Sequence, residues 1–423
     1  MTEPTIRVRG AAFKAFDTPA FTRFYIGTLV SQLGFWSSHI SYQDLMSDLT
    51  SDELWVSMLF VFAFGPVLFV GPIGGILVDR LDRKRVLLAG YAAMMVTAAV
   101  QVAIVATDNE TPVLLLVTSL GVGTTMAIMG PAMQAATANV VPAHQLASAI
   151  SLQSLGANLS RIVGPALVAP IIAAGLFEVS WGAYFVASGI ALMLMSGVDL
   201  SSQERDRSKV GFREQLVSGV RHARERQPAL AALSLVAVVT IFGVSHISLL
   251  PAFTADSLDH DKGDFVWLGV ATGAGALLGA LAAGTLAADA TLRRGAGLAV
   301  PYCALLLVFS RLSSFEIALA IQVVAGFFYI ASFTTLQVLI QQLVDDRLRG
   351  RVMSLFQIAW GGCVPIGALV MGLLAGAAGL DLGSADTIAL TSTVAMIWAA
   401  SIAVAAPRWR STPPEPAAAS AAP

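Results

Sequence analysis

Residues 54–85 read LWVSMLFVFAFGPVLFVGPIGGILVDRLDRKR, and this stretch decides the class of fold. Its first part, residues 54–78, contains no Asp, Glu, Lys or Arg, whereas Asp79 to Arg85 is densely charged. An apolar run of roughly 20 residues is long enough to cross the hydrocarbon core of a bilayer as a helix. A basic cluster directly after it is typical of a cytoplasmic loop. The stretch therefore predicts a membrane-crossing helix followed by a cytoplasmic basic loop.

The composition of the whole chain indicates a membrane protein. Of its 423 residues, 56% are hydrophobic and 12% are charged, against about 25% charged residues in ordinary soluble proteins. So few charges cannot cover a soluble globule, which excludes a soluble enzyme and a disordered chain. The net charge of −2 provides no basic surface for nucleic acid. The two cysteines, Cys303 and Cys363, lie in apolar runs, so we expect no disulfide framework, no metal site and no cofactor.

Charge-free stretches recur along the chain. A longer region, 111–177, has Arg161 as its single charge and splits near Pro142 into crossings at 112–137 and 147–174. With these two, the sequence predicts an all-α polytopic protein with twelve transmembrane helices. The other ten stretches are 24–43, 54–78, 86–107, 179–198, 227–255, 265–288, 295–310, 317–344, 352–380 and 387–407.

The distribution of cations predicts the orientation in the membrane. Of 25 Lys and Arg residues, 22 fall at the termini or in loops on one side, and only Lys262 and Arg311 fall on the other. Because cytoplasmic loops carry an excess of Lys and Arg, we expect both termini to be cytoplasmic in a bacterial inner membrane.

The twelve crossings divide into two bundles of six. The segment from Val141 to Gly164 has a counterpart from Val344 to Gly367, displaced by 203 positions. Parallel internal repeats are typical of transporters. We expect a cytoplasmic N-terminus at 1–20, a six-helix bundle at 21–198, a cytoplasmic linker at 199–229, a second bundle at 230–407 and a disordered tail at 408–423.

The loop Gly71-Pro72-Ile73-Gly74-Gly75-Ile76-Leu77-Val78-Asp79-Arg80-Leu81-Asp82-Arg83-Lys84-Arg85 resembles the signature loop of the major facilitator superfamily. It departs from the general pattern at Asp82, where the family has Gly. The resemblance implies that the acid and the basic residues stabilise the outward-facing state, with Asp79 meeting the helix that begins near Arg351. Cytoplasmic anchoring alone is the simpler explanation for some of the cations. The predicted switch residues are Gly71, Gly75, Asp79, Arg80, Arg83, Lys84 and Arg351.

A narrower resemblance covers most of the chain. The segments Gly130-Pro131-Ala132-Met133-Gln134 and Asn158-Leu159-Ser160-Arg161-Ile162-Val163-Gly164-Pro165-Ala166 resemble the exporter branch that includes the enterobactin exporter and macrolide-efflux-like carriers. The Arg that proton-coupled drug exporters often carry in helix 4 is absent here. Proton coupling is therefore implied by the family more than by these residues.

Arg161 is the sharpest candidate for a site within the membrane. Counted from Ala147, it lies roughly 21 Å along its helix, and a charge at such depth costs at least about 2.5 kcal/mol unless it has a partner or water. One interpretation is a substrate or coupling site that faces a central cavity. The alternative is a structural ion pair or a clamp on main-chain carbonyls.

The first helix carries the candidate partners. Gln32, Trp36, His39 and Gln43 recur at helical spacing and share one face, and Asp44 follows near the outer surface. We hypothesise that His39 or Asp44 takes up and releases a proton while Arg161 influences it. Alternatively, His39 is a hydrogen-bonded packing residue and Asp44 begins an acidic outer loop.

The second half has no acid in mid-membrane, and its polar groups suit a fairly large amphipathic substrate. Each could instead hold helices together. They are His246, Gln322, Tyr329, Thr334, Gln337, Gln357 and Trp360, of which we take Gln322, Tyr329 and Gln357 as pathway residues.

These observations predict a secondary transporter, not an enzyme, since the chain has no P-loop, His-Glu-x-x-His site or Gly-x-Ser-x-Gly elbow. We expect a monomer that exports a drug-like or siderophore-like amphipathic molecule, coupled to protons. The alternatives are uptake or flipping of another metabolite, such as a sugar or a lysolipid, and a sensor or scaffold that transports nothing.

Overall fold

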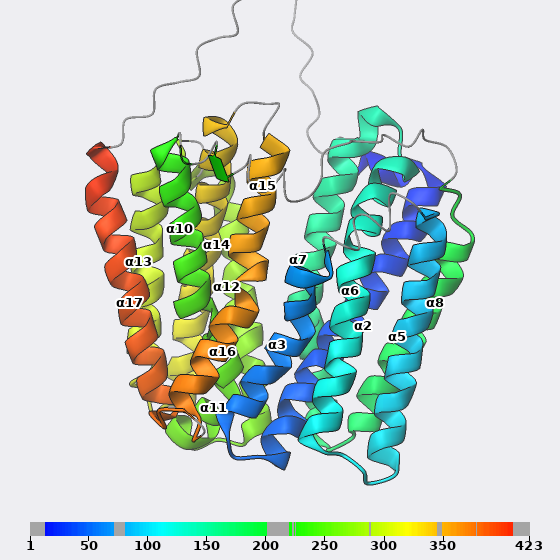
Figure 1. Cartoon of the computed structure of the whole chain (residues 1–423), viewed down its shortest axis with the longest axis horizontal. Helices are drawn as coiled ribbons and strands as arrows, with labels where there is room; N and C mark the ends of the chain where they lie inside the picture. The colour runs from blue at the N-terminus through cyan, green and yellow to red at the C-terminus, as the bar shows by residue number, and fades with distance from the viewer. Residues whose placement is uncertain are drawn as a thin grey trace, which may run out of the picture. The chain divides into compact units, whose positions relative to one another are not determined.

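The computed structural model describes residues 13–71, 81–200, 220–221, 224, 226–286, 289–344, 349–377 and 379–408. Over these residues all regular secondary structure is helical (Figure 1). Within the described ranges, ten helical segments are long and apolar enough to cross a membrane. Two further helices, Pro19–Leu49 and Glu53–Phe69, lie at the positions predicted for the first and second crossings. The predicted all-α polytopic class is thereby confirmed.

Residues 1–208 and 261–270 form the first of two compact units. Three short 3-10 helices accompany its long ones: η1 (Lys14–Asp17), η2 (Ala143–Gln145) and η4 (Lys262–Asp264). The long helices are α2 (Pro19–Leu49), α3 (Glu53–Phe69), α5 (Arg83–Ala106), α6 (Pro112–Val140), α7 (Leu146–Ala173) and α8 (Phe177–Ser196).

Local sequence explains where these helices begin. The carboxylates of Asp52 and Asp82 accept hydrogen bonds from the main-chain N–H groups of Leu54 (3.0 Å) and Arg85 (2.9 Å). Each side chain satisfies an N–H that has no partner within its helix. Pro112 stands in the first turn of α6, where its missing N–H costs nothing.

Small residues let the helices of this unit approach closely. A Cβ atom added at Gly34 of α2 would lie 2.8 Å from Cδ2 of Tyr184 on α8. One added at Gly123 of α6 would meet the main-chain oxygens of Phe62 and Ala63 on α3. Glycine is needed at such points because any side chain would hold the two backbones apart.

Residues 209–260 and 271–423 form the second unit. Helix α12 (Phe265–Leu286) begins in the first unit and continues in the second. The other elements are α10 (Gln227–Phe242), 3-10 helix η3 (Val244–Leu249), α11 (Leu250–Leu258), α13 (Leu292–Phe309), α14 (Phe315–Leu343), α15 (Arg349–Gln357), π-helical turn η5 (Ile358–Gly362), α16 (Val364–Ala375) and α17 (Gly383–Ala405).

Two crossings of the second unit are interrupted, which the charge-free runs 227–255 and 352–380 did not reveal. The seventh passes from α10 through η3 to α11, and the eleventh from α15 through η5 to α16. Pro251 and Pro365 stand in the first turns after these breaks. Proline lacks an N–H and cannot complete the hydrogen bond to the preceding turn, so a break just before it is physically expected.

Candidate functional site

Trp36 of α2 and Arg161 of α7 are brought together in the first unit. The Cζ atom of Arg161 lies 5.5 Å from the centroid of the Trp36 ring. Arg161 is exposed and Trp36 is half-buried. The electron-rich face of an indole attracts a guanidinium, so the ring gives this charge a partner at its depth in the helix.

The contact between α2 and α7 is held at Gly164, one turn after Arg161. Its main-chain oxygen accepts a hydrogen bond from the hydroxyl of Ser37 (2.9 Å). A Cβ atom at Gly164 would lie only 2.8 Å from Cβ of Trp36. The glycine of the Gly164-Pro165 pair thus lets α7 approach α2 closely enough for Arg161 to lie over the indole.

His39 lies one turn beyond Trp36 in an aromatic environment. Its ring centroid is 4.9 Å from that of Phe60 and 5.4 Å from that of Phe64, both edge-to-face, and Phe35 stacks at 6.0 Å. Only 3% of the residue is exposed. Among the residues that the structure describes, its Nε2 atom has no hydrogen-bond partner.

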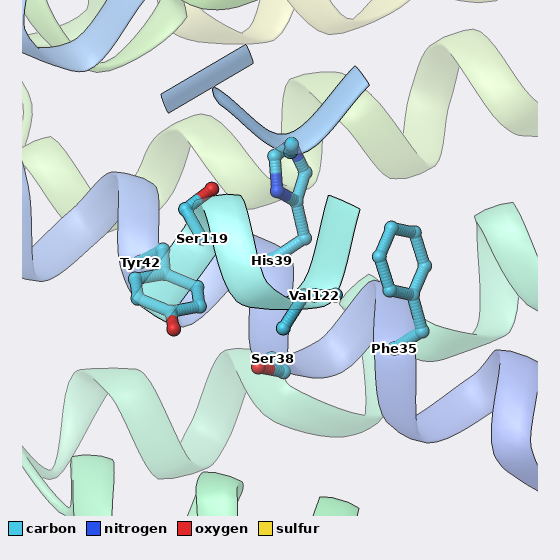
Figure 2. Close-up of a pocket in the computed structure, with 7 residues that line it drawn as sticks. Phe35, Ser38, His39, Tyr42, Ser119 and Val122 are labelled. Carbon is cyan, nitrogen blue, oxygen red and sulfur yellow. The ribbon is translucent and has the colours of Figure 1, made fainter. Parts of the chain in front are cut away.

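A small cavity lies beside His39, between α2, α3 and α6. Figure 2 shows four of its lining residues on α2 and two, Ser119 and Val122, on α6. Its polar lining consists of hydroxyl groups and the imidazole. The full lining is Phe35, Ser38, His39, Tyr42, Ala63, Ser119 and Val122.

The other predicted residues of α2 do not all join this group. Gln32 is half-buried and Gln43 is buried. Asp44, which is 5% exposed, interacts electrostatically with Asp48 and with Lys262 of η4. A Cβ atom at Gly263 would lie 3.4 Å from Oδ1 of Asp44. Asp44 therefore belongs to a second polar cluster, Asp44, Asp48 and Lys262, at the end of α2.

The predicted pathway residues of the second unit differ in their surroundings. Gln322 is fully buried and hydrogen-bonded to Thr272 and His246. Tyr329 is half-buried, and its hydroxyl accepts a hydrogen bond from Nε1 of Trp360 (2.7 Å). Gln357 is exposed at the end of α15. Of the three, Gln357 offers an exposed side chain to a ligand.

The predicted switch residues are only partly described. Gly71 is the last described residue before the gap at 72–80, and Arg83 begins α5. The ammonium group of Lys84 donates a hydrogen bond to the main-chain oxygen of Ser196 (2.7 Å), which ties the start of α5 to the end of α8. Gly75, Asp79 and Arg80 lie outside the described residues, as does the side chain of Arg351.

Two features of these sites escaped sequence reasoning. The sequence identifies Lys262 only as a cation of an outer loop, because nothing local connects it with Asp44. The duplication of Ser38-His39-Ile40-Ser41 as Ser245-His246-Ile247-Ser248 was readable in the sequence and would have paired the two histidines.

In the described part of the chain, no cluster of three or more His, Cys, Asp or Glu residues is arranged to hold a metal ion.

Comparison with known proteins places the chain in a family. A family described as "Transmembrane secretion effector" matches residues 10–421. Macrolide efflux protein A of Streptococcus pyogenes is 27% identical over 358 residues, which cover 79% of this chain and 84% of that protein. The MFS-type transporter YfiS of Bacillus subtilis is 27% identical over 218 residues, covering 50% of this chain. That match spans about half of the relative's length (51%).

Solved structures of major facilitator transporters share the fold. A bacterial homologue of the human lysosomal transporter Spinster, in an inward-facing conformation, matches 92% of this chain and 98% of its own with a TM-score of 0.71 and 14% identity. The nucleoside transporter NupG matches 92% of this chain and all of its own with a TM-score of 0.72 and 11% identity. The protein is thus a multi-pass membrane transporter and not an enzyme, and it belongs to the transmembrane secretion effector family of the major facilitator superfamily.

Proposed function

We propose that this transporter exports an amphipathic small molecule by alternating access between two six-helix halves, 21–198 and 230–407. The direction is supported by the family description and by the similarity to macrolide efflux protein A, whose name specifies efflux. That similarity extends over 84% of the relative, so it is not confined to one half of the fold.

The contact between Arg161 and Trp36 is the observation that carries the choice of substrate. An exposed guanidinium offers several N–H donors in a fixed fork, which suits carbonyl or carboxylate oxygens. The half-buried rings of Trp36 and Phe64, which lie next to each other, supply apolar surface. Such a wall fits a drug-like or siderophore-like molecule that has an apolar body and an oxygen-rich polar end.

Protons are the proposed coupling ion, with His39 and Asp44 as the groups that carry them. His39 is buried and its Nε2 atom has no hydrogen-bond partner among the described residues, which leaves this nitrogen available to a proton. Asp44 is a buried acid next to a cation that can neutralise it when it is ionised. Both lie on α2, one on each side of the cavity-lining Tyr42.

We further propose a monomer in a bacterial inner membrane with both termini cytoplasmic, as the distribution of cations indicates. The loop from Gly71 to Arg85 would act as the conformational switch, with Asp79 pairing at the start of the helix that holds Arg351. Cysteine labelling of single-Cys variants at residues 109 and 205 tests the orientation. Labelling of both positions from the same side of sealed cells contradicts it.

Inverted membrane vesicles test export. The probe is radiolabelled erythromycin, and the vesicle interior is made acidic relative to the outside. We expect erythromycin to accumulate inside vesicles that contain the protein. Arg161→Gln is expected to lower this accumulation several-fold. Arg311→Gln, which removes an exposed cation paired with Asp386 (2.7 Å), is the matched control and keeps it. Accumulation only in right-side-out vesicles indicates uptake, and no flux of any compound of a drug and siderophore panel indicates a sensor or scaffold.

The proton step has its own test. Vesicles carrying the double variant His39→Gln, Asp44→Asn are expected to lose the pH dependence of transport. If the double variant keeps the full pH dependence of the unmodified protein, these two residues do not carry the proton.

A further inference from the structure

The first and seventh crossings contain the same short motif. Phe35-Trp36-Ser37-Ser38-His39-Ile40-Ser41 is repeated as Phe242-Gly243-Val244-Ser245-His246-Ile247-Ser248, 207 positions later. Five of the seven residues are identical. The displacement is close to the 203 positions that separate the other repeated segments, so His39 and His246 are counterparts in the two halves.

The hydrogen bonds of His246 determine which of its nitrogens carries hydrogen. Its Nδ1 lies 2.7 Å from the main-chain oxygen of Gly243. A carbonyl oxygen can only accept, so Nδ1 is protonated and donates. Its Nε2 lies 3.2 Å from Nε2 of Gln322, and an amide nitrogen only donates, so the imidazole Nε2 accepts and carries no hydrogen.

A third residue fixes the orientation of the Gln322 amide. The hydroxyl of Thr272 on α12 donates a hydrogen bond to Oε1 of Gln322 (3.1 Å), which leaves the NH₂ group facing His246. His246 is 2% exposed and Gln322 is fully buried. A second proton on His246 would require the amide of Gln322 to rotate, because its NH₂ group already donates to the imidazole Nε2.

Gly243 explains why the motif has this form in the seventh crossing. A Cβ atom there would lie 2.7 Å from the main-chain oxygen of Val239 and 3.2 Å from Cε1 of Tyr302. A residue like Trp36, its counterpart, does not fit. Directly after Gly243 the helix changes to 3-10 geometry as η3, and the Gly243 oxygen accepts both the main-chain N–H (3.3 Å) and the Nδ1–H of His246.

The counterpart in the first crossing is in a different hydrogen-bonding state. Around His39, α2 continues as an unbroken α-helix from Pro19 to Leu49. Its ring packs against Phe35, Phe60 and Phe64. Within the described residues no donor or acceptor engages its Nε2 atom, in contrast to Nε2 of His246. The same five residues therefore occur in two settings. Nε2 of His246 is hydrogen-bonded to Gln322, whereas Nε2 of His39 has no hydrogen-bond partner among the described residues.

We infer that His246 is a positioning residue that braces the break between α10 and α11 as a neutral imidazole with hydrogen on Nδ1, and that of the two histidines only His39 takes up a proton. The part concerning His39 rests on the proposed function, whereas the brace at His246 does not. Gln322 is then part of the brace and not a ligand contact.

Other titratable or charged groups stand on the elements around the two histidines. On the elements that pack around η3 they are Asp256 of α11, Tyr302 and Cys303 of α13, and Tyr329 of α14. On α2 and the elements that pack against it they include Tyr42, Asp44 and Asp48 of α2, Glu53 of α3, Arg161 of α7, Glu178 and Tyr184 of α8, and Lys262 and Asp264 of η4.

Nitrogen NMR of the full-length protein in lipid bilayers, with ¹⁵N-labelled histidine, tests the inference. The variants His39→Gln and His246→Gln assign the two signals. Between about pH 5 and pH 9, we expect His246 to keep one protonated and one bare nitrogen, with Nδ1 protonated. Of the two histidines, His39 is expected to be the first to gain a second proton as the pH falls, because its Nε2 receives no hydrogen bond among the described residues.

Two substitutions at Gln322 sharpen the test. Gln322→Glu places a carboxylate beside Nε2 of His246 and is expected to make His246 doubly protonated at neutral pH. Gln322→Leu, which supplies no acceptor, is expected to leave it neutral. The brace is refuted if His246 titrates in the unmodified protein or carries its hydrogen on Nε2. If His246 behaves as expected but His39 never titrates, only the proposed proton step fails.

Discussion

The ammonium group of Lys262 donates a hydrogen bond to the main-chain oxygen of Ser47, and through this contact η4 packs on α2. Residues 261–270 belong to the first unit although the chain on both sides of them belongs to the second. Lys262 also acts electrostatically on Asp44 and Asp48. Lys262 thus donates a hydrogen bond to a carbonyl at the end of α2 and offsets the negative charge of two acids.

Removing this cation is expected to loosen η4. A hydrogen bond from a charged donor contributes about 1.5 kcal/mol or more, so Lys262→Ala should speed amide hydrogen exchange of residues 261–264 by roughly tenfold. Lys262→Arg, which keeps a cationic donor, should retain most of the protection. Equal exchange rates in the Ala variant and the unmodified protein would show that the contact contributes nothing to local stability.

The pair formed by Trp36 and Arg161 should be energetically coupled. Cation–π contacts of this kind contribute about 0.5–1 kcal/mol where the cation is exposed. We expect the thermal stabilities of Trp36→Leu, Arg161→Gln and the double variant to be non-additive by about that amount. Strict additivity of the three variants, measured in the same detergent, would mean that the two side chains act independently.

Substitution of Gly164 should separate α7 from α2. The added methyl group of Gly164→Ala would lie 2.8 Å from Cβ of Trp36 and 3.1 Å from the main-chain oxygen of Leu33, and overpacking of this kind costs about 1–3 kcal/mol. We expect a lower melting temperature and weaker erythromycin transport. Gly182→Ala in the same unit is the control, because nothing lies within 4 Å of its added Cβ. Similar losses in both variants would show that the effect comes from losing a glycine, not from this contact.

Gly326 on α14 allows a close approach between two helices of the second unit. A Cβ atom there would collide with the main-chain oxygen of Thr272 on α12. Because a backbone atom cannot move aside as a flexible side chain can, Gly326→Ala is expected to destabilise the protein by about 1–3 kcal/mol or more. Gly297→Ala on α13, with open space around the added methyl, should leave the melting temperature nearly unchanged. A Gly326→Ala protein as stable as the control would contradict the close approach of α12 and α14.

Much of the architecture was predictable because its causes are local. An apolar run must form a helix in lipid, since its backbone has no other hydrogen-bond partners there. The ends of α6 and α7 near Pro142 therefore fell within a few residues of prediction. Likewise, the depth of Arg161 followed from its position in the run, and its need for a partner followed from its charge.

Which residues pair with the buried polar groups depended on the tertiary structure. Spacing placed Gln43 on the same face as Trp36 and Asp44 after it near the outer surface. Packing then brought Lys262, more than 200 positions away, to Asp44. The clearest case is the repeated motif, where identical residues leave His39 in a continuous helix and His246 at a break. Whether a buried imidazole nitrogen finds a partner depends on which side chains other helices bring to it, and Gln322 and Thr272 are distant in the sequence. The chain alone thus determined the crossings and the family, whereas contacts between helices decided which polar groups are braced and which remain available.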